Sequence, residues 1–245
     1  RNTTSPATSS KLWACMYLPG ADIFLYLPDD ETTSERIYRR LLRCIISLKR
    51  NEFLAGSSDV YLYKISKPMN IYLIRHTSVD VPAGYAYGQT DVPLKPTFEE
   101  EAEEVKKGLS DHTFDKVWTS PLTRCVRLAN YCGFPEAERE DRIKEVNFGE
   151  WEMKSWNELS SDPRSEAWFK DWVNNPTPNG ESLQDQYDRV SDFLNELRKS
   201  GLQKVCLFAH GGVLTCARVY AGEYPLQDAF KNVPSYGAIV KLVLD

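Results

Sequence analysis

Residues 70–76 read Asn-Ile-Tyr-Leu-Ile-Arg-His, an apolar run that ends in two basic side chains. A second apolar run, within residues 205–212, reads Val-Cys-Leu-Phe-Ala-His-Gly-Gly and ends in a histidine followed by two glycines. Short apolar runs rich in Ile, Val and Leu, bounded by polar residues or glycine, predict buried strands. We therefore expect two such strands, with His76 and His210 each placed just beyond a strand end.

Strand patterns alternate with helix patterns from residue 70 onward. The expected strands are 70–75, 116–119, 205–209 and 239–244, and the expected helices are 98–109, 121–132, 181–199 and 212–220. Ser120 is expected to cap the helix that Pro121 opens. Strands separated by helices predict an α/β fold, with a three-layer, mostly parallel sheet flanked by helices on both faces.

The first 68 residues differ from the rest of the chain. They carry 10 Lys and Arg residues against 7 Asp and Glu residues, whereas the net charge of the whole chain is −5. Residues 12–18 and 23–27 predict a hairpin around a Pro-Gly-Ala-Asp turn, residues 35–48 predict a helix and residues 60–65 predict a short strand.

Three interpretations of this segment stay open: a small accessory subdomain, a weakly ordered segment, or sequence upstream of a natural start at Met69. We expect the last two together. The predicted organisation is a small N-terminal appendage over 1–68, an extension of unknown role, followed by the main domain over 69–245.

Composition excludes several classes of function. The net charge of −5 argues against broad electrostatic binding to nucleic acid or to an anionic membrane. The six cysteines form no CxxC pair and no Cys/His zinc spacing, so we expect buried thiols in a reducing compartment. The apolar tract 12–27 is broken by Pro19, Gly20 and Asp22, and it is not in signal-peptide order, so a cytoplasmic location is expected.

Two histidines and two arginines predict an anion site. Ligands of open α/β sheets bind at the carboxyl ends of the strands, so His76 and His210 are expected to meet in one crevice. Arg75 directly precedes His76, and Arg124 follows the start of an expected helix, where backbone N–H groups also favour anions. Because guanidinium groups match phosphate oxygens, this set indicates phosphate binding. His112, in a polar loop, is expected at the surface.

An acid is the third expected ingredient. Glu145 lies in Ile-Lys-Glu-Val-Asn-Phe-Gly, residues 143–149, between an extended run and a glycine turn. The residues alone do not distinguish Glu145 from Glu150 or Glu152 as the acid.

Five motifs in order carry a resemblance to a known family. They are Arg75-His76, Ser-Pro-Leu-Thr-Arg over 120–124, Glu-Val-Asn-Phe-Gly-Glu-Trp-Glu over 145–152, Asn-Gly-Glu-Ser over 179–182 and Ala-His-Gly over 209–211. Residues 70–245 resemble the histidine phosphatase superfamily, also called phosphoglycerate mutase-like. Residues 75–82 and 87–94 further resemble its α-ribazole-5′-phosphate phosphatase branch, which serves the nucleotide loop of cobalamin. Thr77 stands where most members have glycine.

The resemblance implies a role for each site residue. His76 would attack phosphorus and form a phosphohistidine. Arg75, Arg124 and His210 would neutralise the phosphoryl oxygens, with contacts from Thr77 and the N–H of Gly211. Glu145 would protonate the leaving oxygen and then assist water, so we expect it to be partly buried. No cofactor and no metal ion are expected.

The expected reaction is hydrolysis of a phosphomonoester, with a small phosphorylated metabolite such as α-ribazole 5′-phosphate as partner. No nucleic acid or membrane partner is expected. The sequence does not determine the oligomeric state, and a homodimer is one possibility. Alternatives are a phosphoglycerate mutase, a sugar-phosphate phosphatase, or a phosphate-binding module without turnover.

Residues 151–180 hold four tryptophans and three prolines and predict a helical lid over the pocket. The tryptophans either pack the lid onto the core or line the pocket. In the second case an aromatic substrate moiety would fit.

Overall fold

The computed structural model describes residues 13–18, 21–26 and 68–244. The chain divides into two compact units, Arg1–Lys64 and Ile65–Asp245. Among the described residues, no helix is both long and apolar enough to cross a bilayer.

The described part of the first unit is a hairpin. Strands β1 (Trp13–Leu18) and β2 (Ala21–Tyr26) pair antiparallel, with Leu18 opposite Ala21. The predicted hairpin is therefore present, with its second strand shifted toward the N-terminus. The helix predicted over 35–48 and the strand predicted over 60–65 lie outside the described residues.

The second unit contains a five-stranded sheet in the order β5-β4-β6-β3-β7. Its strands are β3 (Met69–Arg75), β4 (Lys116–Thr119), β5 (Glu138–Arg139), β6 (Lys204–Ala209) and β7 (Ile239–Leu244). β7 runs antiparallel to β3, and the other neighbouring strands are parallel. The predicted mostly parallel sheet is confirmed.

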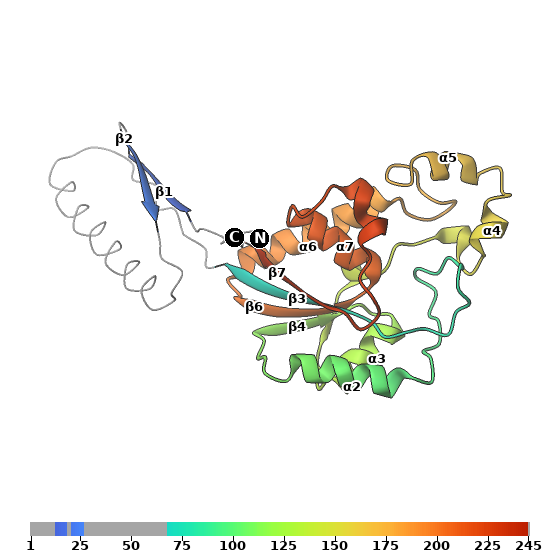
Figure 1. The fold of residues 1–245 in the computed structure, drawn as a ribbon, viewed down its shortest axis with the longest axis horizontal. Coiled ribbons are helices and arrows are strands. Elements are labelled where there is room, and N and C mark those ends of the chain that lie inside the picture. Colours follow the sequence, from blue (N-terminus) through green and yellow to red (C-terminus); the bar gives the residue numbers. More distant parts are fainter. Residues whose placement is uncertain (1–12, 19–20, 27–67, 245) are drawn as a thin grey trace, which may run out of the picture. The chain divides into compact units, whose positions relative to one another are not determined.

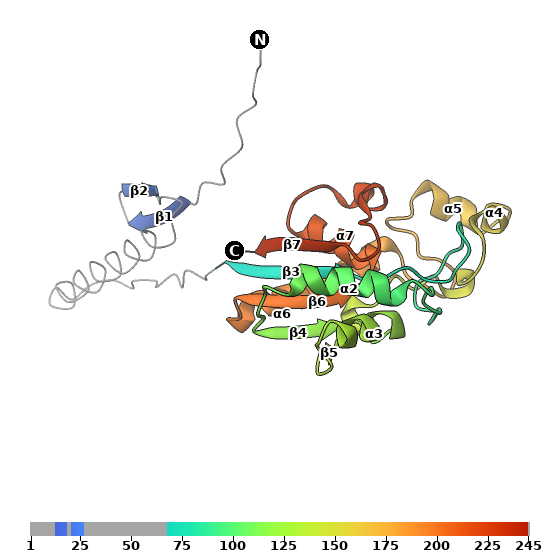
Figure 2. The same ribbon diagram turned by 60° about the horizontal axis from the view of Figure 1, so that its bottom comes forward.

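Helices cover both faces of this sheet (Figures 1 and 2), and the side chains of β3 alternate between those two faces. Ile71 and Leu73 face a core that includes residues of α6 (Leu183–Ser200) and α7 (Gly211–Tyr220). Tyr72 and Ile74 face a second core that includes residues of α2 (Phe98–Leu109) and α3 (Thr123–Tyr131). Each fully buried aliphatic side chain contributes about 1.5–3 kcal/mol, so the two apolar layers fix the strand ends that carry the polar residues.

The ends of the helices follow local capping chemistry. α6 begins two residues later than predicted, because Ser182 and Asp185 form a reciprocal capping box. It ends at Gly201, whose φ of 81° is a conformation that glycine adopts without strain.

The prediction that Ser120 caps a helix opened by Pro121 is wrong. α3 begins at Thr123, with Leu122 in the capping position. The hydroxyl of Ser120 lies 2.7 Å from Nε2 of His210, a tertiary hydrogen bond shorter than its local one, which it accepts from the N–H of Leu122 at 3.4 Å.

The predicted lid contains two short helices, α4 (Trp156–Leu159) and α5 (Ser165–Lys170), joined by irregular chain. In both views it lies beyond the carboxyl ends of β3 and β6 (Figures 1 and 2). Its core is a separate aromatic cluster: Trp156 stacks on Trp168 at 5.5 Å, and Trp151 meets Trp168 edge-on at 5.6 Å.

The buried thiols expected from composition are present where side chains are described. Cys125, Cys132, Cys206 and Cys216 are free and buried. Burial raises the thiol pKa of Cys125 and Cys132 to about 12, so both thiols are protonated at neutral pH.

Candidate active site

Three neighbouring strands end side by side and place polar residues together. Arg75 of β3 lies opposite Ala209 of β6, and the N–H of His76 donates to the Ala209 carbonyl at 3.1 Å. The N–H of Ser120, just after β4, donates to the Phe208 carbonyl at 2.8 Å. The rings of His76 and His210 consequently lie with centroids 5.2 Å apart, so the two predicted histidines share one crevice.

His76 has the protonation state that a nucleophile needs. Its Nδ1 lies 2.7 Å from the carbonyl of Thr77, which only accepts, so Nδ1 carries the proton and Nε2 keeps its lone pair. Burial, and then the charges of Arg124 and Arg75, lower the pKa of His76 to about 3, against the opposing hydrogen bond to Thr77. The ring is therefore neutral at physiological pH.

His210 has the other tautomer. Its Nδ1 accepts a hydrogen bond from Nε of Arg124 at 3.2 Å, so the proton lies on Nε2, which donates to the Ser120 hydroxyl at 2.7 Å. Burial, and then the charges of Arg124 and His76, lower its pKa well below the ordinary value. Sequence reasoning missed Ser120 as a site residue; its position one residue past a strand was the available signal.

Arg124 is fully buried and binds three groups. Besides His210, it donates to the carbonyl oxygens of Thr90 at 3.0 Å and Gly88 at 2.5 Å. A guanidinium has five N–H donors, so two remain for a ligand. The sequence did not predict that the loop 88–90 holds Arg124, because the contacts are made by backbone carbonyls, which no residue type reveals.

Arg75 is held from two sides. It donates to the Pro234 carbonyl, and its Cζ lies 4.0 Å from the centre of the Tyr236 ring. A Cβ added to Gly211 would lie 3.3 Å from that Cζ, so glycine allows the guanidinium to approach the start of α7. Within the described chain, buried Nε of Arg75 and the buried hydroxyl of Thr77 have no hydrogen-bond partner. Both atoms can bind phosphoryl oxygens.

The Glu145 side chain is half-buried, as expected, and its carboxylate contacts the first turn of α7. Its carboxylate accepts hydrogen bonds from Gln186 at 2.8 Å and from the N–H of Gly212 at 3.1 Å. Its backbone carbonyl accepts from Gln89 at 3.1 Å and from Arg189 at 3.0 Å. The Glu145 carboxylate is thus held at the backbone N–H of Gly212, the second residue after His210.

The structure separates Glu145 from the two acids that the sequence left open. Glu150 is exposed and pairs with Arg164 at 2.7 Å. Glu152 accepts the backbone N–H groups of Gly88 at 2.9 Å and Gln89 at 2.8 Å, so its carboxylate serves the loop 88–90. Only Glu145 of these three contacts the α7 terminus in the described chain.

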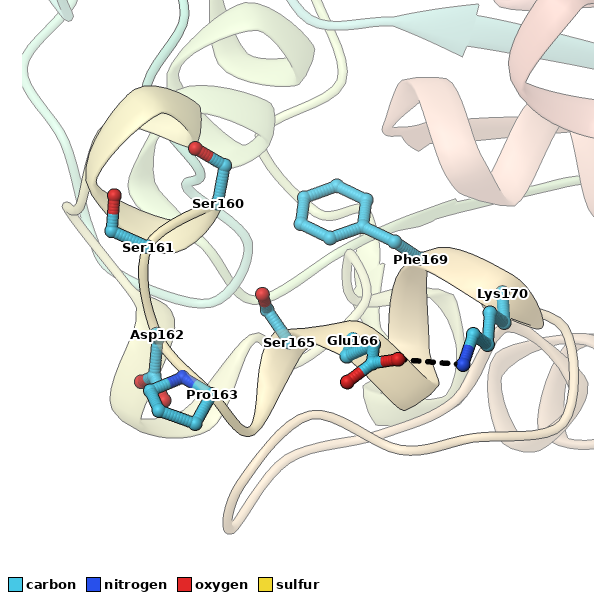
Figure 3. A pocket seen from close by; sticks show the side chains of 8 residues that line it. All are labelled: Ser160, Ser161, Asp162, Pro163, Ser165, Glu166, Phe169 and Lys170. Carbon is cyan, nitrogen blue, oxygen red and sulfur yellow. Dashed lines mark hydrogen bonds and ion pairs between the residues drawn. The ribbon is translucent and has the colours of Figure 1, made fainter.

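Two further features lie away from this crevice. His112 is half-buried rather than at the surface, since its ring packs edge-on against Tyr72 at 4.7 Å. An open hollow of about 460 Å³ lies on the lid (Figure 3) and is lined by residues 160–163, 165, 166, 169 and 170. Glu166 and Lys170 pair across its edge at 2.7 Å, and no residue of the histidine crevice lines it.

Two neutral imidazoles, two guanidiniums and one carboxylate lie together at the carboxyl ends of parallel strands, a set whose charges and donors suit an anionic phosphoryl group. The sequence profile described as Histidine phosphatase superfamily (branch 1) matches residues 71–245. The chain belongs to this superfamily.

Individual relatives are similar over much of this domain. The adenosylcobalamin/α-ribazole phosphatase of Salmonella typhimurium is 29% identical over 60% of this chain and 76% of its own length. Phosphoserine phosphatase 1 of Hydrogenobacter thermophilus is 30% identical over 54% of this chain and 65% of its own length. The crystal structure of the α-ribazole phosphatase of Shigella flexneri is 26% identical with a TM-score of 0.65, over 71% of this chain and 89% of that one.

Proposed function

We propose that this protein hydrolyses phosphomonoesters through a phosphohistidine formed on His76. One observation carries the proposal: the hydrogen bond from Nδ1 to the Thr77 carbonyl leaves the lone pair on Nε2 of a neutral, buried ring. That nitrogen belongs to a ring 5.2 Å from His210 and is surrounded by the charges of Arg124 and Arg75. A nucleophile in such a cationic setting suits attack on an anionic phosphorus centre.

The proposed reaction has two steps, phosphorylation of His76 and hydrolysis of the phosphohistidine. Nε2 of His76 forms a bond to phosphorus while the ester P–O bond breaks, and protonated Glu145 gives its proton to the leaving oxygen. Water then attacks phosphorus, the carboxylate of Glu145 takes the water proton, and the P–N bond breaks to release phosphate and neutral His76. The same carboxyl group acts as acid and then as base.

Cationic groups and hydrogen-bond donors would compensate the negative charge on the phosphoryl oxygens. Arg124 has two N–H donors left, and Arg75 and Thr77 have buried donors without a partner among the described residues. The N–H of Gly211 lies at the start of α7, where the helix favours anions. His210 takes part by fixing the Arg124 guanidinium through its Nδ1. Because these groups are cationic or hydrogen-bond donors, the proposal requires no metal ion.

Within this class we propose α-ribazole 5′-phosphate as the substrate, a small metabolite. The support is the resemblance of residues 75–82 and 87–94, together with the relative from Salmonella typhimurium that bears this activity in its name. A relative of comparable identity is named for phosphoserine, so phosphoserine is the necessary competitor in any assay.

The test of the reaction is His76→Ala, measured with p-nitrophenyl phosphate. We expect a loss of at least about 1,000-fold in kcat/KM, because no other group replaces the nucleophile. His112→Ala is the matched control, since its ring packs on Tyr72 away from the crevice. Phosphate trapped on the unchanged protein should be acid-labile and base-stable. Near-normal turnover by His76→Ala would overturn the proposal.

The substrate is tested separately, by comparing kcat/KM for α-ribazole 5′-phosphate, phosphoserine, 3-phosphoglycerate and a sugar phosphate. Preference for α-ribazole 5′-phosphate is expected. Conversion of 3-phosphoglycerate to its 2-isomer would identify a mutase instead.

A further inference from the structure

Two tyrosine rings lie against the two guanidiniums of the site. The Tyr236 ring centre is 4.0 Å from Cζ of Arg75, and the Tyr87 ring centre is 5.7 Å from Cζ of Arg124. Their hydroxyl groups lie 2.5 Å apart, which joins the two rings. Neither tyrosine was expected from the sequence to have a role in the site.

The same pair lies beside the nucleophile. The Tyr236 ring centre is 5.5 Å from that of His76, with the planes tilted by 49°. Tyr236 is 38% exposed, so its ring lies between the buried imidazole and solvent. Burial and the hydrogen bond to Tyr236 raise the pKa of Tyr87, so this phenol is neutral at the pH of the reaction. An aromatic surface therefore borders the nucleophile on its exposed side.

The residue next to each tyrosine is hydrogen-bonded through its backbone to another segment. The segment of Tyr87 is bonded to the lid, since the N–H of Ala86 donates to the Lys154 carbonyl at 2.8 Å. The segment of Tyr236 is bonded to the nucleophile's own backbone, since the N–H of Gly237 donates to the His76 carbonyl at 3.1 Å. Two preformed rings offer contact area without a large ordering cost on binding.

The lid tryptophans are not available for this purpose. Trp151 and Trp168 are buried within the lid cluster, and Trp156 stacks on Trp168. Trp172 packs against Phe230, with ring centres 5.7 Å apart. Aromatic surface at the histidine crevice therefore comes from the tyrosine pair.

Resting on the proposed function, we propose that Tyr87 and Tyr236 form the leaving-group subsite and select phosphomonoesters whose alcohol carries an aromatic ring. An aromatic group stacks on these rings better than a saturated group of the same shape, by roughly 2- to 10-fold in affinity. The selection acts on binding of the ester and leaves phosphoryl transfer to His76.

The test uses benzylphosphonate and cyclohexylmethylphosphonate, a pair that differs in aromaticity and cannot be hydrolysed. Calorimetry on the full chain should show roughly 2- to 10-fold tighter binding of the benzyl compound. Tyr236→Leu should abolish the preference, whereas Tyr236→Phe should keep it. Tyr85→Leu is the matched control, because Tyr85 is 37% exposed and pairs with the lid at Ser155. Thermal unfolding of each variant verifies that it folds.

Kinetics with benzyl phosphate and cyclohexylmethyl phosphate should show the same preference, expressed in KM rather than in kcat. Equal affinities of the two phosphonates for the unchanged protein would overturn the subsite, as would an equal loss for both in Tyr236→Leu. A retained benzyl preference in binding, without turnover of either ester, would support the subsite and refute the proposed hydrolysis.

Discussion

The carboxylate of Glu152 orders the loop that holds Arg124, and its removal is a quantitative test of that arrangement. It accepts the N–H groups of Gly88, Gln89, Thr90 and Phe148 at 2.8–3.2 Å, and the Thr90 hydroxyl at 2.7 Å. The carbonyls of the same loop receive two hydrogen bonds from the guanidinium. Glu152→Ala should therefore affect both stability and activity.

The magnitude follows from burial of the donors. Gly88 and Phe148 are buried, so their N–H groups lose a partner that water cannot easily replace, at about 1–3 kcal/mol each. Gln89 and Thr90 are half-buried, and water can replace much of what they lose. We expect a destabilisation of about 4 kcal/mol, or about 8–16 °C in Tm for a domain of this size. Misplacement of the guanidinium by about 1 Å should lower kcat/KM about 100-fold.

Urea and thermal unfolding measure the first effect, and turnover of p-nitrophenyl phosphate measures the second. Glu150→Ala is the matched control: this exposed acid forms a surface pair with Arg164, so little change in stability or activity is expected. A Glu152→Ala protein as stable as the Glu150→Ala control would refute the reasoning.

The pH dependence has a definite sign. Burial raises the pKa of Glu152, but hydrogen bonds from Gly88, Thr90 and Gln89 outweigh it and hold the pKa below the ordinary value of 4.5. A carboxyl group with a depressed folded-state pKa stabilises the fold above its unfolded pKa and loses that contribution as pH falls through the folded pKa. The stability difference between the unchanged protein and Glu152→Ala should therefore narrow below pH 4.5.

Three further predictions concern the crevice. Gly212→Ala would place a Cβ 2.4 Å from the Glu145 carboxylate, and should lower kcat for alkyl phosphates about 100-fold. The first-turnover release of p-nitrophenol should stay near normal, because this leaving group needs no acid. Ser120→Ala removes the acceptor of His210 Nε2 and should lower kcat/KM about 10-fold, with restored activity in Ser120→Thr; full activity of the alanine variant would refute this role. The pKa of His76 is about 3 in the folded protein instead of 6.5, so this histidine takes up a proton in the unfolded chain first as pH falls. The free energy of unfolding should therefore decline below pH 6.5, by up to about 1.4 kcal/mol per pH unit. This slope should be smaller in His76→Gln.

The sequence predicted the histidine crevice because strand ends and their first polar residues are local features. The apolar runs before His76 and His210 determine both strands, and parallel pairing places their ends together. Ser120 was misassigned, because a capping preference of about 1 kcal/mol yields to a buried hydrogen bond with His210.

Other parts of the site depend on contacts between distant segments. Tyr87 and Tyr236 lie 149 positions apart, and no periodic pattern connects them. The family resemblance pointed to Glu145, but its contacts with Gln186 and the α7 terminus, which distinguish it from its neighbours, join distant segments of the chain. The expected cytoplasmic location, the possible homodimer and the role of residues 1–68 stay predictions.

The segment 84–90 belongs to the lid and to the cation site at once. Its first half pairs with the lid, through the Ala86 carbonyl and Met153 at 2.7 Å and the Gly84 carbonyl and Trp156 at 2.8 Å. Its second half holds the guanidinium of Arg124. Any outward displacement of residues 153–156 would therefore pull on the same short segment whose carbonyl oxygens hold the Arg124 guanidinium.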